Sequence, residues 1–176
     1  MDGDTVYLIP AKEEDAAAMK KLLRPETLTN MSLSEKPITL ESQTAYLREM
    51  AESRTSFLFC IMLNGVMIGT TGLHECDFVN KTARVGTIIF DPALRGRGYG
   101  KSARRLIIDR AFGEMSLNKV YINLLADNYR RFADLEKFGF RRECLLEKEY
   151  LLRGKYRNMI RFRLFKGEWK NICKKK

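Results

Sequence analysis

The chain has 176 residues, which fits one domain of ordinary size, because domains typically span roughly 100 to 200 residues. Hydrophobic residues make up 45% of the chain and charged residues 31%, a globular composition that excludes a disordered or collagen-like protein. The net charge of +10 is distributed unevenly along the chain: residues 1–80 carry 7 basic and 12 acidic side chains, whereas residues 81–176 carry 25 basic and 10 acidic ones. The basic second part predicts an anionic ligand, either nucleic acid or a phosphate-rich small molecule.

The first half of the chain predicts two helices followed by a β-hairpin. A short strand at residues 6–9 precedes a helix at about 13–23, and a second helix begins at Thr39 and ends before Ser53. Aromatic and branched residues at 57–63 and the run 66–75 predict two strands. Asn64-Gly65 between them is a strong signal for a two-residue hairpin turn.

The second half predicts a strand at 84–90, a helix at 100–115 and a strand at 120–125. Asn128 is then predicted to cap a helix that ends at Gly139. Two further strands, at about 143–152 and 156–165, are joined through residues 153–155. Hairpins combined with one strand-helix-strand crossover predict an α/β fold with a mixed, mostly antiparallel sheet and about four flanking helices.

Cysteine and histidine usage gives no indication of a metal or disulfide site. The four cysteines, which include Cys144, lie far apart without a CxxC pair, and His74 is the single histidine. The longest apolar runs are far shorter than the roughly 18 residues that a membrane-spanning helix needs, and the N-terminus lacks a signal-peptide pattern. We therefore expect a soluble, cytoplasmic protein without a metal.

The most informative segment joins the strand that ends near Phe90 to the following helix. Glycines alternate at positions 96, 98 and 100, so the backbone can turn tightly and direct its amide hydrogens at one anion beside the positive end of the helix. The spacing matches neither GxGxxG nor the phosphate-binding GxxxxGK[ST] loop, which weakens an NAD or ATP assignment. A diphosphate is the ligand that this geometry predicts. The alternative is a flexible turn with exposed arginines.

Two ordered motifs resemble the GNAT superfamily of acetyl-CoA-dependent N-acetyltransferases. Residues 95–100 read R-G-R-G-Y-G and match the pyrophosphate-loop pattern [QR]-x-x-G-x-[GA], and residues 128–140 resemble the asparagine-led helix that ends in E-K-x-G-F. The resemblance extends over the whole chain and is nearest to the RimJ/RimL-type and spermidine N-acetyltransferase branches. It implies one domain over residues 1–176, splayed around the cofactor, with an acetyl-CoA-binding core at 88–140, a closing hairpin at 141–165 and a basic tail at 166–176.

The resemblance also implies which residues bind acetyl-CoA. The loop amides would hold its pyrophosphate, the main chain of the preceding strand would pair with the pantetheine arm, and an amide there would polarise the acetyl carbonyl. The residues so implied are Ile88, Ile89, Phe90, Arg95, Gly96, Arg97, Gly98, Tyr99, Gly100, Lys101 and Asn128.

Three positions depart from the family pattern. Leu135 stands where the spermidine branch has the tyrosine that protonates the departing thiolate, and Arg131 stands where the other branch has a serine. Arg84 stands where many relatives have a glutamate. The general acid is therefore unassigned, and we expect an atypical acceptor site.

The residues themselves offer a few catalytic candidates. Glu75 and His74 are the candidate bases, with a slight preference for Glu75, and regular strand alternation would place at most one of them in a shared cleft. Each is also compatible with a purely structural role. Tyr129 and Tyr150 are weaker candidates, for the acid. Cys144 has no histidine partner in sequence, so we favour direct transfer over covalent catalysis.

The predicted function is transfer of acetyl from acetyl-CoA to a primary amine on a small amine, an amino sugar or a protein N-terminus. Spermidine should be a poor acceptor, because residues 141–176 carry 13 basic and 4 acidic side chains and Leu135 replaces the usual acid. Two alternatives are a non-catalytic CoA-binding protein and, less favoured, a nucleic-acid-binding module with aromatic residues on a basic surface. Relatives often form homodimers, and a membrane partner is not expected.

Overall fold

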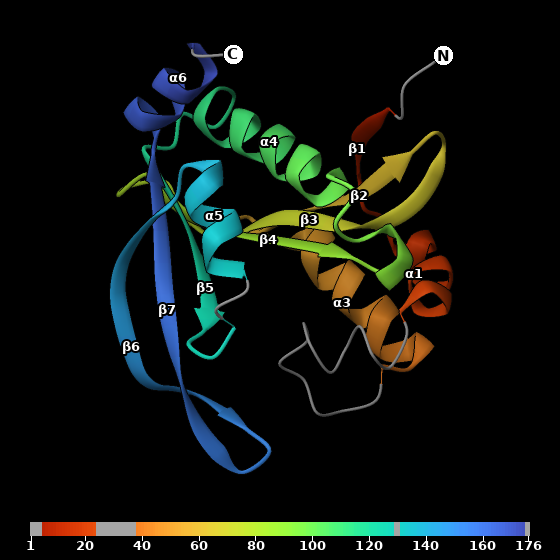
Figure 1. Cartoon of the computed structure of the whole chain (residues 1–176). Helices are drawn as coiled ribbons and strands as arrows, with labels where there is room; N and C mark the ends of the chain where they lie inside the picture. Colours follow the sequence, from red (N-terminus) through yellow and green to blue (C-terminus); the bar gives the residue numbers. More distant parts are fainter. Residues whose placement is uncertain (1–4, 24–37, 129–130, 175–176) are drawn as a thin grey trace. The chain divides into compact units, whose positions relative to one another are not determined.

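The computed structural model describes residues 5–23, 38–128 and 131–174 (Figure 1). Its first half contains β1 (Val6–Pro10), the 3-10 helix η1 (Glu13–Asp15), α1 (Ala16–Leu22), α3 (Leu40–Glu52), β2 (Phe57–Leu63) and β3 (Val66–Asp77). Its second half contains β4 (Thr82–Ile89), the 3-10 helix η2 (Pro92–Leu94), α4 (Tyr99–Phe112), β5 (Lys119–Leu125), α5 (Phe132–Phe138), β6 (Arg141–Leu152), β7 (Lys155–Phe165) and α6 (Lys166–Lys174).

Seven strands form one sheet in the order β1-β2-β3-β4-β5-β7-β6. The β1–β2, β2–β3, β5–β7 and β6–β7 pairs are antiparallel, and β4–β5 is parallel. The parallel ladder registers only Thr82–Arg84 against Lys119–Tyr121. This mixed, mostly antiparallel sheet confirms the predicted fold class. The described ranges contain five α-helices, one more than expected, because residues in the predicted basic tail form α6.

Contacts divide the chain into two compact units. Unit 1 comprises Met1–His74 and Gly86–Ile108, and unit 2 comprises Glu75–Val85 and Asp109–Lys176. Strands β3 and β4 contribute residues to both units, so the division does not fall at a linker. A single acetyltransferase domain over residues 1–176 therefore remains our prediction.

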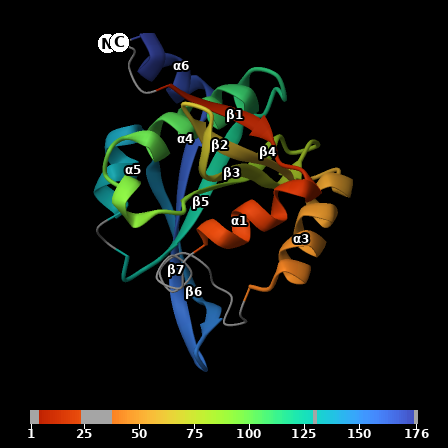
Figure 2. The same ribbon diagram turned by 90° about the vertical axis from the view of Figure 1, so that its right-hand side faces the viewer.

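Unit 1 buries apolar side chains on both faces of its strands. On one face, α1 and α3 lie side by side (Figure 2) and bury Cys60 and Phe90. On the other face, α4 packs Ala103 against Ile61 and Ile89. Because successive strand residues point to opposite faces, continuous apolar strands such as β2 supply both cores. Helix α4, which follows the glycine-rich loop, is thus fixed on the sheet.

Local sequence signals explain where the elements of unit 1 begin and end. The Thr39 side chain accepts a hydrogen bond from Ser42 N at 3.1 Å, which confirms the predicted helix start. Asn64 and Gly65 have φ of 49° and 85°, as a two-residue hairpin turn requires. The helix predicted at 13–23 begins as η1, where Asp15 accepts a hydrogen bond from Lys12 N at 2.8 Å.

Unit 2 is built on an aromatic core beneath α5 and α6. Phe132 packs on Phe162 with ring centroids 5.2 Å apart, and Trp169 stacks on Phe138 at 5.4 Å. The indole N–H of Trp169 donates to Asp109 Oδ1 at 2.7 Å. Gly139, at φ 119°, ends α5 as predicted. The expected start of α5 is wrong, because Arg131 rather than Asn128 is its N-cap residue, and no side chain caps it.

Candidate functional site

The glycine-rich loop before α4 has the backbone that an anion site requires. Gly96 and Gly98 have φ of 77° and 93°, in the left-handed region that residues with a Cβ adopt only at a cost. Within the described part of the chain, nothing lies within 4 Å of a Cβ built at either glycine. Helix α4 begins at Tyr99, and the backbone hydrogen bond that opens it runs from Ser102 N to Gly98 O at 3.0 Å, so the amides of residues 99–101 precede the intrahelical hydrogen bonds. The loop and helix start therefore fit a diphosphate group.

Arg95 fixes this loop onto the end of β4. Its Nε donates to the carbonyl of Ile89 at 3.1 Å, and a terminal nitrogen donates to the carbonyl of Phe90 at 3.3 Å. The side chains of Ile89 and Phe90 are buried in the two cores of unit 1. The N–H of Phe90 donates to the carbonyl of Ile68 at 2.9 Å, so several main-chain groups of this strand end already have partners, and its pairing with pantetheine stays a prediction.

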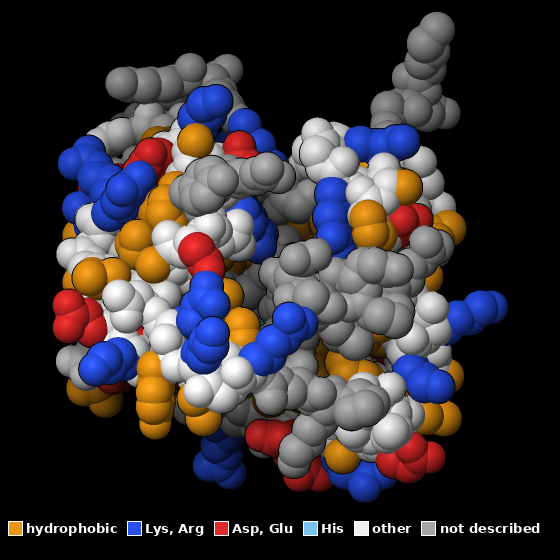
Figure 3. Space-filling model, turned by 60° about the horizontal axis from the view of Figure 1, so that its bottom comes forward, with side chains coloured by type: hydrophobic (Ala, Val, Ile, Leu, Met, Phe, Trp, Pro, Cys, Tyr) orange, Lys and Arg blue, Asp and Glu red, His pale blue; other side chains and the backbone are white. Residues whose placement is uncertain are grey.

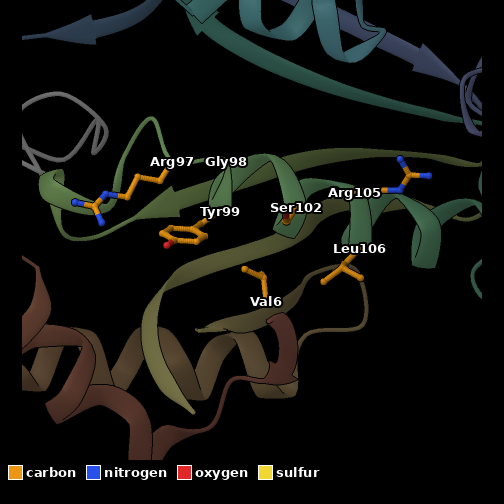
Figure 4. Close-up of a pocket in the computed structure, with 7 residues that line it drawn as sticks. All are labelled: Val6, Arg97, Gly98, Tyr99, Ser102, Arg105 and Leu106. Carbon is orange, nitrogen blue, oxygen red and sulfur yellow. The ribbon is translucent and has the colours of Figure 1, made fainter. Parts of the chain in front are cut away.

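A groove of about 380 Å³ runs beside the loop and the first turns of α4 (Figure 4). Arg97 and Arg105 lie at opposite ends of the groove, with Tyr99 and Ser102 between them. Val6, Gly98 and Leu106 complete its lining. The groove places two cationic side chains next to a loop that is already suited to phosphate.

His74 has its imidazole ring against two glycines. A Cβ built at Gly72 would lie 3.2 Å from His74 Nε2, and one built at Gly86 would lie 3.3 Å away. Gly86 needs no left-handed backbone, and the ring is its only close neighbour among the described residues, so a side chain there would press on the ring alone. On β4, Gly86 precedes Ile88 by two residues, so the two positions share a strand face about 7 Å apart. The structure therefore brings His74 near the segment predicted to bind pantetheine.

Glu75 has a different environment. Its Oε1 accepts from Arg84 Nε at 2.8 Å, and its Oε2 accepts from the hydroxyl of Tyr121 at 2.9 Å. Burial and the bond to Glu75 raise the pKa of Tyr121 to about 12, so the phenol stays protonated and remains a donor. Glu75 has a left-handed φ of 53°, so the regular alternation assumed between residues 74 and 75 is wrong. Both oxygens of the predicted base thus already have donors.

The remaining predicted residues fall in different places. The N–H of Asn128, in unit 2, donates to the carbonyl of Leu125 at 2.9 Å and closes a turn after β5, and its own carbonyl accepts from Arg131 N at 3.1 Å. Tyr129 lies outside the described residues. Tyr150 lies in the β6–β7 hairpin, opposite Arg157. Leu135 is only 3% exposed, within the core of unit 2.

The cysteines differ sharply in accessibility. Burial raises the pKa of Cys60 to about 12 and that of Cys76 to about 11, so both thiols stay protonated at neutral pH and are poor nucleophiles. Cys144 is exposed. These thiols give no support to covalent catalysis.

Several basic side chains in the second half of the chain form ion pairs with carboxylates. On the face in Figure 3, Lys and Arg side chains are interspersed with Asp and Glu. The pairs in the second half of the chain include Arg84–Glu75, Arg110–Glu114, Lys119–Glu143, Arg142–Glu136, Arg157–Asp127 and Arg163–Glu168. These pairs neutralise part of the positive charge of residues 81–176, which carry 25 basic side chains in all. No helix in the described ranges has the length and hydrophobicity to cross a membrane.

Comparison with known proteins assigns the family. The model of the family described as "Acetyltransferase (GNAT) domain" matches residues 5–141. The chain belongs to the GNAT acetyltransferase family. The matched range contains the glycine-rich loop, His74 and Glu75, and so covers most of the predicted site.

Named relatives include spermidine N(1)-acetyltransferase of Escherichia coli, 28% identical over 124 residues that cover 70% of this chain and 64% of the relative. The prophage-derived N-acetyltransferase YokL of Bacillus subtilis is 24% identical over 167 residues, which cover 95% of this chain and 93% of the relative. The GNAT chain described here thus aligns with slightly less than two thirds of the E. coli relative.

A solved structure with a similar fold is that of spermidine N-acetyltransferase from Vibrio cholerae in complex with CoA and spermine. It superposes with a TM-score of 0.84 over 94% of this chain and 98% of that one, at 18% sequence identity. At this identity the likeness establishes the GNAT fold alone.

Proposed function

We propose that this GNAT protein transfers acetyl from acetyl-CoA to a primary amine by direct attack. The proposal is carried by the conformation of the loop before α4, in which Gly96 and Gly98 have a left-handed backbone and no described atom lies within 4 Å of a Cβ built at either position. The amides of Arg97, Gly98, Gly100 and Lys101 would hold the pyrophosphate, and the main chain of residues 88–90 would pair with the pantetheine arm. Bound acetyl-CoA supplies the thioester that the amine attacks.

His74 is the group that we propose as the base. A primary amine is mostly protonated at neutral pH, so attack requires a group that removes a proton, and imidazole is the side chain best suited to this near pH 7. The glycines at 72 and 86 leave room for its ring, whereas Glu75 already accepts two hydrogen bonds. The ammonium first releases one proton to solvent, and as the neutral nitrogen bonds to the acetyl carbon a second proton passes to His74 and the carbon–sulfur bond breaks.

Protonation of the departing sulfur does not depend on residue 135. A thiol has a pKa near 8.5, so the sulfur can leave as a thiolate and take its proton from solvent. Leu135, buried in unit 2, is therefore compatible with turnover. Tyr129 remains the predicted acid if a side chain performs this step.

The test combines a binding and a product measurement on the full chain. Calorimetry should show CoA binding that Gly98→Glu abolishes, because the new carboxylate would occupy the open space in front of α4. Acetylated amine should be detected by mass spectrometry, since the exposed Cys144 would interfere with thiol-reactive dyes. Binding without any product would instead indicate a non-catalytic CoA-binding protein. Absence of both, together with a salt-dependent nucleic-acid gel shift, would favour the nucleic-acid alternative.

A further inference from the structure

Helix α4 carries a stripe of groove-lining residues that continues from the glycine-rich loop. Gly98, Ser102 and Arg105 are spaced by four and three residues, and residues at this spacing share one face of a helix. All three line the groove of about 380 Å³ beside the loop (Figure 4). Every residue that lines the groove belongs to unit 1. The groove therefore begins at the predicted diphosphate site and runs along α4 within one compact unit.

Arg105 lies at the end of the groove that is farther from the loop, and Arg97 lies at the other end. Arg105 follows Gly98 by seven residues, which is about 10 Å along the helix axis at a rise of roughly 1.5 Å per residue. Rotation about the bonds of the half-buried Arg105 side chain can bring its guanidinium over the groove between these two positions. A second anionic group, held a short distance along α4 from the diphosphate, would meet this cation.

The rest of the lining has the chemistry of a nucleotide-binding surface. Ser102 presents an exposed hydroxyl, and Tyr99 presents an aromatic ring. Val6 and the exposed Leu106 add apolar surface on which a purine can lie. None of the seven lining residues in the described part of the chain is acidic, so the lining itself does not repel a phosphate. A ligand with phosphates at two positions of one sugar, and a base beside them, fits this pattern.

We propose that Arg105 binds the 3′-phosphate of CoA, with the hydroxyl of Ser102 as a second donor. This inference rests on the proposed function, of which it specifies how the nucleotide end of the donor is selected. CoA carries its diphosphate and a phosphomonoester on the same ribose, so one anion would meet the loop and the other would meet Arg105. The planar guanidinium can donate two hydrogen bonds to one phosphate. Dephospho-CoA, which lacks the 3′-phosphate, would lose this contact.

Calorimetry with CoA and dephospho-CoA on the full chain tests the contact directly, because the two ligands differ only by the 3′-phosphate. The unaltered protein should bind CoA about 10- to 100-fold more tightly, as expected for hydrogen bonds to a charged group. Arg105→Gln should weaken CoA binding by that factor and leave dephospho-CoA binding nearly unchanged. Arg105→Lys, which keeps the charge and loses the planar fork, should keep part of the preference. Ser102→Ala should lower the preference about two- to tenfold.

Arg110→Gln is the matched control. Arg110 lies on the same helix, outside the groove lining, and is paired with Glu114 at 2.9 Å. This variant removes the same charge and should leave the preference for CoA over dephospho-CoA intact. Equal effects of the two glutamine variants would overturn the proposal. An equal loss of both ligands in Arg105→Gln, or an unaltered protein that does not distinguish the two ligands, would also overturn it.

Adenosine 3′,5′-bisphosphate distinguishes the nucleotide end of CoA from a separate nucleotide. We expect it to bind the free protein, to lose affinity in Arg105→Gln and to be displaced by CoA. Undiminished binding to the CoA-saturated protein would overturn the assignment, because the groove would then hold a second ligand. The two proposals fail separately: equal binding of CoA and dephospho-CoA overturns the role of Arg105 alone, whereas no binding of either ligand overturns the loop assignment as well.

Discussion

Replacement of Gly98 by alanine tests the cofactor loop with a control of matched strain. Gly98 and Gly65 have φ of 93° and 85°, and nothing described lies within 4 Å of a Cβ at either position. Each alanine should therefore lower the free energy of unfolding by about 1–2 kcal/mol, through backbone strain alone. Gly65 lies in the β2–β3 hairpin turn, which has no predicted contact with CoA.

Only Gly98→Ala should also weaken CoA binding. Relief of the strain would rotate amide groups away from the diphosphate, and a hydrogen bond to a charged group contributes about 1.5–3 kcal/mol, so the dissociation constant should rise about 10- to 100-fold. Urea unfolding followed by circular dichroism gives the stability of both variants, and calorimetry gives their affinity for CoA. Equal CoA affinities for Gly98→Ala, Gly65→Ala and the unaltered protein, at matched destabilisation, would refute the assignment of the loop.

Three further predictions concern the proposed base and α6. His74→Gln should lower kcat about 100-fold or more. In a profile of kcat/KM against pH, it should also abolish the decrease at low pH that protonation of a histidine base causes; a variant that keeps this decrease would assign the proton transfer to another group. Gly86→Ala should lower kcat about tenfold with little change in stability, because its Cβ would meet only the His74 ring, and unaltered kcat would argue against this positioning. Trp169→Phe should lower the free energy of unfolding by about 1–2 kcal/mol through the lost donor to Asp109, measured by circular dichroism because this is the single tryptophan.

The parts of the fold that depend on local chemistry could be predicted from the sequence. Turns such as Asn64-Gly65 require particular backbone angles that few residues adopt, and apolar alternation identifies half-buried strands. All seven strands were expected, with bounds that differ by at most a few residues. The start of α5 was misplaced because an asparagine that suits a helix cap suits a turn equally well, and Asn128 lies in a turn.

The side-chain network around Tyr121 could not be predicted in this way. Tyr121, Asn123 and Arg161 look like ordinary polar positions of half-buried strands, and only the register between β5 and β7 shows that Asn123 faces Arg161. The left-handed backbone at Glu75 has no local signal, because neither a glycine nor an asparagine marks it. Side-chain networks across non-adjacent segments depend on register, which propensity and spacing do not encode.

The hydrogen bonds around Glu75 give a physical reason for an arginine, rather than the family's glutamate, at residue 84. A glutamate there, as the family resemblance would lead one to expect, would place a second carboxylate next to Glu75 and disfavour ionisation of both. Arg84 instead donates to Glu75, whose other oxygen accepts from Tyr121. Glu75 can therefore stay charged as the anchor of a ring on which Arg161 stacks, while the proton transfer is left to another group. The charge at residue 84 thus connects two features of this chain: a glutamate whose two oxygens both accept hydrogen bonds, and a tyrosine ring, anchored by that glutamate, that contacts the guanidinium of Arg161.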